Sequence, residues 1–94
     1  MTARMLPGAP VAEAVLTELA PRIKALVEAG HTPGLGTILV GEDSASAGYI
    51  RVKQEKAAEL GFTSPHIHLG QDATQADVIA AIRDFNNAPE VDAM

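Results

Sequence analysis

The stretch that decides the fold is Leu35-Gly-Thr-Ile-Leu-Val-Gly-Glu-Asp-Ser-Ala-Ser-Ala-Gly-Tyr-Ile-Arg-Val-Lys53. Its first six residues form a short, nearly continuous apolar run that ends at Gly41, which is typical of a strand buried on both faces. Small polar residues follow at Asp43 and Ser44, and such residues cap the free amides at the start of a helix. The stretch therefore predicts a strand that passes through a polar turn into a helix, which we expect to run to Leu60.

Two further elements flank this stretch. Apolar residues recur every three or four positions from Val11 to Val27, which predicts an amphipathic helix. Pro21 lies inside that pattern and predicts a kink or a restart, because proline lacks an amide donor and clashes with the preceding turn. After the central helix, β-forming residues from Phe62 to Leu69 predict a second strand. Pro65 favours an edge position for that strand, since proline cannot donate to a ladder.

The last third of the sequence predicts a third helix and the start of another strand. Thr74-Gln-Ala-Asp77 resembles a capping box, and the apolar residues after it share one helix face as far as Asn86-Asn87-Ala88-Pro89. Val91 to Met94 is typical of the first residues of a strand. The order of elements predicts an open three-layer α/β/α parallel sheet with right-handed crossovers, truncated before its later strands.

Composition limits the classes of function. At 94 residues and 47% hydrophobic content the chain has the size of one small folded domain. Seven basic against twelve acidic residues give a formal net charge of -5, which argues against nucleic acid or an anionic membrane as the general partner. The absence of cysteine excludes disulfides and thiolate metal sites. No apolar run approaches the roughly 18 residues of a membrane span, so we expect a soluble, cytoplasmic protein.

Candidate chemistry gathers on the helix that follows the first strand. Ligands bind at the carboxyl ends of the strands in open parallel sheets. Tyr49 and Lys53 stand four residues apart, so their phenol and ammonium groups project from one helix face. The functional interpretation is a ring that stacks on a planar ligand beside a lysine that handles protons. From spacing alone, a solvated helix face explains the same pair.

Other polar groups have simpler explanations. His66 and His68 alternate on one strand and could offer two imidazoles to a metal, but no third ligand is near, so we expect a solvent-facing pair and no metal. Glu42 and Asp43 could form a catalytic carboxylate couple, but capping by Asp43 explains them better. Their charge also argues against a phosphate at the start of the helix. A short-chain dehydrogenase shares the Tyr-x-x-x-Lys spacing, but no glycine-rich phosphate loop precedes Tyr49.

The string from Pro33 to Lys53 closely resembles the methylenetetrahydrofolate dehydrogenase/cyclohydrolase family, whose pattern is P-G-L-A-x-I-L-V-G-D-D-P-A-S-x-x-Y-V-x-x-K. The resemblance continues through Lys56-Ala-Ala-Glu-Leu-Gly-Phe62 and covers essentially the whole chain. It implies that Tyr49 stacks on the folate ring, that Lys53 assists water attack on the methenyl carbon, and that Ser46 is a polar contact of the same pocket. Glu55 departs from the pattern and weakens the cationic face, so Lys56 is given no role in substrate binding.

The resemblance also implies what a complete family member would contain. Such enzymes transfer hydride from 5,10-methylenetetrahydrofolate to NADP or NAD, hydrolyse the product to 10-formyltetrahydrofolate, and usually form homodimers. Residues 1–94 correspond to an N-terminal folate-binding catalytic domain without its Q-L-P-L-P segment and without the NAD(P)-binding Rossmann domain. The fragment alone is therefore expected to be inactive and to contain no cofactor-binding residue. A non-catalytic half-domain that acts as an interaction or pseudoenzyme module is the alternative.

Overall fold

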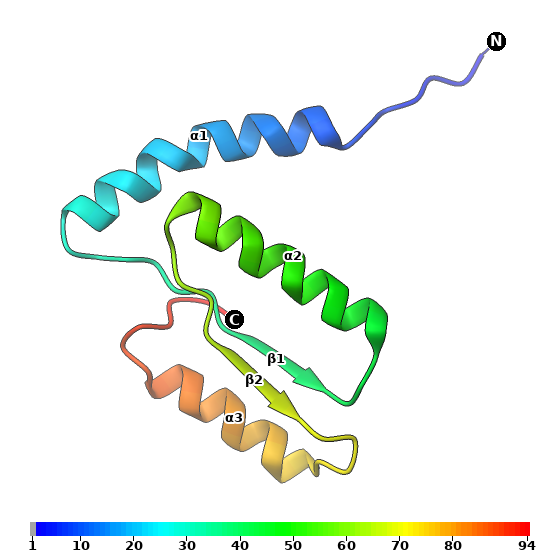
Figure 1. The fold of residues 1–94 in the computed structure, drawn as a ribbon, viewed down its shortest axis with the longest axis vertical. Helices are drawn as coiled ribbons and strands as arrows, with labels where there is room; N and C mark the ends of the chain where they lie inside the picture. Colours follow the sequence, from blue (N-terminus) through cyan, green and yellow to red (C-terminus); the bar gives the residue numbers. More distant parts are fainter. Residues whose placement is uncertain (1) are drawn as a thin grey trace.

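The computed structural model describes residues 2–94 and places five elements along the chain (Figure 1). In chain order they are α1 (Ala9–Glu28), β1 (Thr37–Val40), α2 (Ser44–Leu60), β2 (His66–Leu69) and α3 (Gln75–Asn87). This alternation of helices and strands confirms the predicted α/β class.

The two strands pair in parallel, with Thr37 opposite His66 and Val40 opposite Leu69. Strand β2 is shorter than the predicted stretch from Phe62, because Pro65 has no amide to donate and Thr63 joins only through an isolated bridge to Gly34. Within residues 2–94, β2 has β1 as its one neighbour. Its predicted position at an edge therefore holds for the described part of the chain.

A third segment lies on the other side of β1. Ala93 forms an isolated parallel bridge with Leu35, and the Gly36 amide donates to the Ala93 carbonyl at 2.7 Å. The strand predicted from Val91 to Met94 is thus present as this single bridge. The chain crosses from β1 to β2 and then back past β1 to Ala93.

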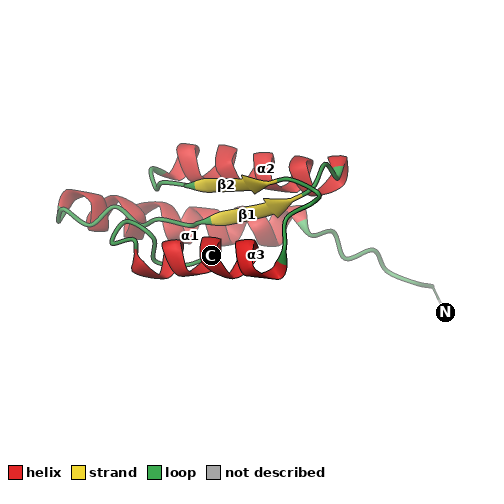
Figure 2. Ribbon diagram, turned by 90° about the horizontal axis from the view of Figure 1, so that it is seen from below, coloured by secondary structure: helices red, strands yellow, loops and turns green. Residues whose placement is uncertain are grey.

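Helices α2 and α3 cover opposite faces of the strands (Figure 2). Two successive crossovers of the same hand that move in opposite directions across a sheet place their helices on opposite faces, as the predicted right-handed connections require. On the α3 side the strand needs a glycine, because a Cβ on Gly36 would lie 2.9 Å from ring carbons of Phe85. The three-layer prediction is therefore confirmed around β1.

Helix α1 runs without interruption through Pro21, so of the predicted kink or restart the restart does not occur, and Figure 1 shows the helix axis bending near its middle. Proline at this position removes the hydrogen bond to the carbonyl of Thr17. Thr17 is exposed, and water can satisfy its carbonyl there, so the cost of the missing bond is low enough for the helix to continue.

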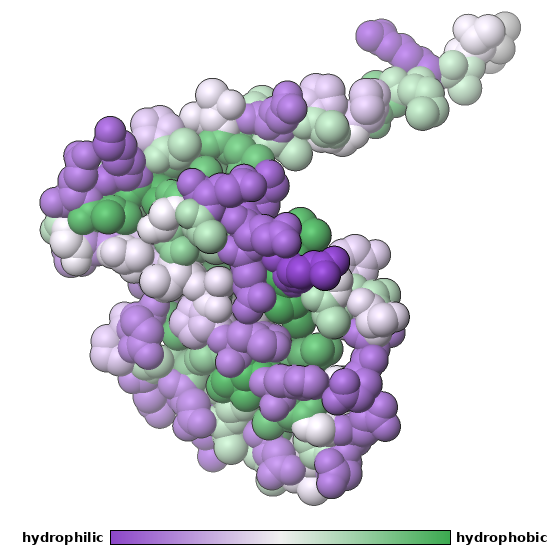
Figure 3. Space-filling model, in the orientation of Figure 1, coloured by the Kyte–Doolittle hydropathy of each residue, from purple (hydrophilic) through white to green (hydrophobic). Residues whose placement is uncertain are grey.

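The buried core is small and consists of Ile23, Leu39, Ala57, Ala81 and Phe85. The predicted burial of β1 on both faces is wrong at its end, because Leu39 is buried whereas Val40 is 42% exposed. Gly36 faces Phe85 of α3, and side chains alternate along a strand, so Val40 also lies on the α3 side. That side is open at the end of the strand. Apolar side chains also reach the surface along α1 (Figure 3). No helix among the described residues is long and apolar enough to cross a membrane.

Candidate functional site

The turn between β1 and α2 is held by local hydrogen bonds. Gly41 adopts a left-handed backbone conformation with φ of 86°, which glycine reaches without steric cost. Asp43 caps α2, since its Oδ2 accepts from the Ser46 amide at 3.0 Å and from the Ser46 hydroxyl at 2.6 Å. The hydrogen bond from the Ser46 hydroxyl, followed by that from its amide, holds the pKa of Asp43 below its ordinary value. These contacts confirm the capping role of Asp43.

The same contacts decide two smaller questions. Asp43 already occupies the Ser46 amide at the start of α2, so this end of the helix is neutralised from within and does not favour a phosphate. Ser46 directs its hydroxyl hydrogen to Asp43, which leaves the hydroxyl oxygen as an acceptor for any ligand.

Tyr49 and Lys53 project from α2, but the structure places them differently. Lys53 lines a cavity of about 360 Å³ together with residues of β1, α2, α3 and the last residue of the chain, namely Gly36, Thr37, Ile38, Ile50, Ile82 and Met94. Tyr49 and Ser46 are not in its lining, and Tyr49 is 70% exposed. The predicted site residues therefore share one helix, and one of the three lines a cavity.

Neighbouring cations on α2 are paired with acids one turn along the helix. Arg51 lies 4.0 Å from Glu55, and Lys56 lies 3.1 Å from Glu59. Within residues 2–94, Lys53 takes part in no ion pair. Glu55, the departure from the family pattern, thus neutralises Arg51, and Lys53 is the cation of this helix directed to the cavity.

The two strand histidines are both exposed, with ring centroids 6.4 Å apart, and each contacts β1 or the turn after it. His66 Nδ1 lies 2.7 Å from Thr37 Oγ1, and His68 Nε2 lies 2.7 Å from the Gly41 carbonyl oxygen. No group of three metal-binding side chains occurs in the part of the chain that the structure describes. The sequence did not predict the contact between His68 and Gly41, because only the parallel register of β1 and β2 brings these two residues together.

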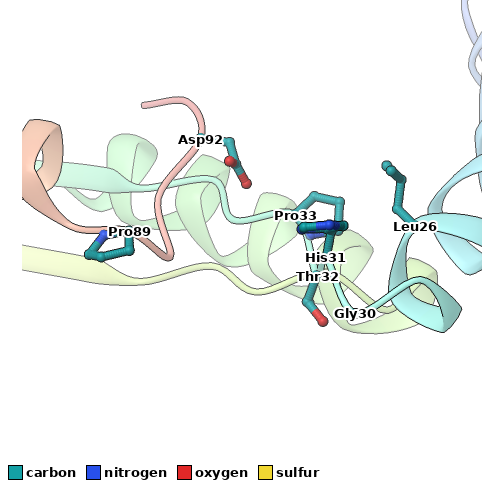
Figure 4. Close-up of a pocket in the computed structure, with 7 residues that line it drawn as sticks. All are labelled: Leu26, Gly30, His31, Thr32, Pro33, Pro89 and Asp92. Carbon is teal, nitrogen blue, oxygen red and sulfur yellow. The ribbon is translucent and has the colours of Figure 1, made fainter.

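A second cavity, of about 430 Å³, lies before the amino end of β1 and was not predicted (Figure 4). Its lining includes Leu26, His31, Pro89 and Asp92. One carboxylate oxygen of Asp92 accepts from the Gly34 amide at 2.9 Å, so this side chain joins the C-terminal segment to the start of the sheet. This cavity is near the amino end of the strand, whereas parallel sheets bind ligands at the carboxyl ends.

The fold and these contacts define an α/β domain in which the first crossover helix carries a tyrosine and a lysine, and the lysine lines a cavity beside residues 36–38 of a parallel strand. Comparison with known proteins identifies the family. Residues 6–94 match the family described as tetrahydrofolate dehydrogenase/cyclohydrolase, catalytic domain, and the chain belongs to this family.

Relatives agree with this assignment. The chain is 55% identical over 80 residues to the bifunctional protein FolD 1 of Salinispora tropica, a match that covers 85% of this chain and 26% of that protein. It is 47% identical over 93 residues to the bifunctional protein FolD of Syntrophotalea carbinolica, with coverage of 99% and 32%. The chain therefore spans about a quarter to a third of the length of these curated relatives.

A solved structure matches the fold. The N5,N10-methylenetetrahydrofolate dehydrogenase-cyclohydrolase (FolD) of Trypanosoma brucei, complexed with NADP cofactor and inhibitor, matches with a TM-score of 0.86 and 28% identity. The match covers 100% of this chain and 34% of that one. The arrangement of α1 to α3 around a parallel sheet is thus a family fold.

Proposed function

We propose that this chain is the N-terminal folate-binding part of a longer bifunctional enzyme of one-carbon metabolism. That enzyme oxidises 5,10-methylenetetrahydrofolate to the methenyl form with NADP or NAD and hydrolyses the product to 10-formyltetrahydrofolate. The observation that carries the proposal is Lys53, an ammonium group without an acidic partner among the described residues, which lines a cavity beside a parallel strand. Membership of the family supplies the substrate class.

The roles of three residues follow from their chemistry. The exposed ring of Tyr49 offers a flat face to the fused rings of a tetrahydrofolate. Lys53 moves a proton during attack of water on the methenyl carbon, and Ser46 offers its hydroxyl oxygen to a ligand donor.

Backbone hydrogen bonds indicate how the cavity is closed. The amides of Thr37 and Gly41 are donated to β2, and amides alternate between the two sides of a strand. Those of Ile38 and Val40 therefore point away from β2, towards the side where Ala93 begins to pair. A strand that continues from Ala93 would satisfy them and enclose Lys53. We accordingly assign residues 1–94 to an incomplete N-terminal domain.

The described residues do not fit a nicotinamide dinucleotide. A dinucleotide site needs a glycine-rich turn whose helix amides are free for the pyrophosphate, and here the Asp43 carboxylate occupies the Ser46 amide. We therefore assign the cofactor to the further NAD(P)-binding domain that the proposal requires. A cytoplasmic homodimer is the form in which we expect the complete enzyme.

The test uses the full-length gene product and follows loss of the methenyl chromophore. Lys53→Ala is expected to lower the cyclohydrolase rate by a factor of about 10² or more, as removal of a general acid or base does. Lys56→Ala is the matched control, since this lysine of the same helix is paired with Glu59. Tyr49→Ala should mainly raise KM. Normal cyclohydrolase activity in Lys53→Ala would refute the assignment of Lys53.

A non-catalytic interaction module is the second candidate, and exposed apolar side chains on α1 favour it. Val11 and Val15 are 65% and 48% exposed. A full-length product that binds no folate analogue in calorimetry would support this alternative over the enzyme.

A further inference from the structure

The turn that leads into α2 is anchored to β2 through both polar groups of one residue. The Gly41 amide donates to the Leu69 carbonyl at 2.9 Å, and the Gly41 carbonyl oxygen lies 2.7 Å from His68 Nε2. The left-handed conformation of Gly41 sets the direction of this carbonyl. The end of β1 is therefore joined to β2 by a backbone bond and a side-chain bond at the same position.

The direction of the side-chain bond is fixed by its chemistry. A carbonyl oxygen can only accept, so Nε2 of His68 must carry the hydrogen. His68 is the strand partner of Leu39, and its ring reaches forward along the same face to the residue that begins the turn. The Glu42 carboxylate, 3.6 Å from the same nitrogen, is too far for a second hydrogen bond but adds attraction whenever the imidazole is charged.

Packing holds the turn only at Gly41, which is buried. Glu42, Asp43 and Ser44 are all exposed, so beyond Gly41 the hydrogen bonds of Gly41 and the cap of Asp43 define where α2 begins. Ser46, in the first turn of α2, and Tyr49, less than two turns from its start, take their positions from that beginning, whereas Lys53 lies deeper in the helix and beside the cavity.

We infer that His68 is a positioning residue for the folate site: by donating to Gly41 it holds the β1–α2 turn, and through it the Ser46 and Tyr49 side chains, in the arrangement that binds the substrate. This role rests on the proposed function. Within the described residues, His68 forms no hydrogen bond or ion pair with Tyr49 or Lys53, and it takes no part in the reaction itself. Its loss acts on substrate binding more than on the chemical step.

The experiment compares three variants of the full-length enzyme. His68→Leu removes the donor, His68→Gln restores an amide donor at a reach similar to Nε2, and His66→Leu removes the neighbouring histidine, whose side chain bonds to Thr37. Loss of one hydrogen bond corresponds to about three- to tenfold in affinity. We expect His68→Leu to raise KM for the methenyl substrate by that factor with kcat within about twofold, His68→Gln to recover most of the loss, and His66→Leu to match the wild type.

A second measurement separates the contact from the function. Amide hydrogen exchange should accelerate at Gly41 and Ser46, whose amides donate to Leu69 and Asp43, in His68→Leu and return towards the wild-type rate in His68→Gln. Unchanged exchange and unchanged KM would overturn the inference, as would equal effects of His68→Leu and His66→Leu. If exchange accelerates in His68→Leu but the wild-type enzyme itself has no cyclohydrolase activity, the contact is confirmed. The proposed function is then refuted and, with it, the role of His68 in substrate binding.

If His68→Leu does not fold, His68→Asn replaces it. The shorter amide keeps a polar group on the exposed strand but cannot reach the Gly41 carbonyl. It is expected to raise KM as His68→Leu would, and a KM equal to that of His68→Gln would overturn the inference.

Discussion

The turn from Gly41 to Ser46 and helix α1 represent two extremes of how this chain is organised. In the turn, short-range and cross-strand hydrogen bonds account for Gly41, Asp43 and Ser46. Helix α1 has one buried residue, Ile23, and its other apolar side chains are exposed to different degrees. The turn is thus held by hydrogen bonds that the described residues supply themselves. The apolar face of α1, in contrast, is stabilised only where another surface covers it.

The largest change in stability is expected from a substitution that weakens the packing of α1 against the rest of the protein. Ile23→Ala should lower the free energy of unfolding by about 2 kcal/mol, because removing methylene groups from a buried site costs transfer free energy and leaves a cavity. Val15→Ala is the matched control on the same helix. With 48% of its surface already exposed, it should change stability by less than about 0.5 kcal/mol. Urea unfolding followed by circular dichroism measures both. Equal losses would show that α1 is held along its whole length.

A smaller effect is expected at the start of the turn. Gly41→Ala should cost about 1 to 2 kcal/mol, because a Cβ disfavours the left-handed conformation that Gly41 adopts. Gly48→Ala is the control inside α2, where an added Cβ meets nothing within 4 Å. It should stabilise the protein by about 0.5 to 1 kcal/mol, since alanine favours helix over glycine. Thermal unfolding of both variants provides the comparison, and a destabilised Gly48→Ala would contradict the assigned geometry.

The smallest effect concerns the cap and depends on pH. Asp43→Ala should destabilise α2 at neutral pH, because the Ser46 amide loses its acceptor. The folded-state pKa of Asp43 lies below its ordinary value of 3.8, owing first to the Ser46 hydroxyl. A depressed folded pKa gives stability that is present above the unfolded value and is lost as pH falls through the folded value.

The difference in stability between wild type and Asp43→Ala should therefore be constant above about pH 5 and shrink below about pH 4. Asp43→Asn is the control, since asparagine caps about as well as aspartate but does not titrate. Its difference from Asp43→Ala should depend less on pH. A wild-type advantage that grows as pH falls would contradict the depressed pKa of Asp43.

Most of the local structure followed from residue type. Asp43 and Gly61 marked the ends of α2, and Thr74 and Asp77 formed the predicted capping box. Errors arose where neighbours decide the outcome. Val40 was not buried, because the α3 side of β1 is open at that point, and at Pro21 the helix bends without the restart that was the other predicted outcome. The pairing of His68 with Gly41 had no signal in the sequence.

The sequence by itself determined the order of helices and strands, the caps of α2 and α3, and the resemblance that led to the folate family, because these depend on residues close together in the chain. The tertiary structure decided which of the candidate site residues lines a cavity. It directed Lys53 towards the open side of β1, left Tyr49 exposed, and brought His68 to the turn across 27 residues of sequence. The physical reason is that parallel register and layer packing juxtapose residues distant in the chain, and no local pattern encodes that distance.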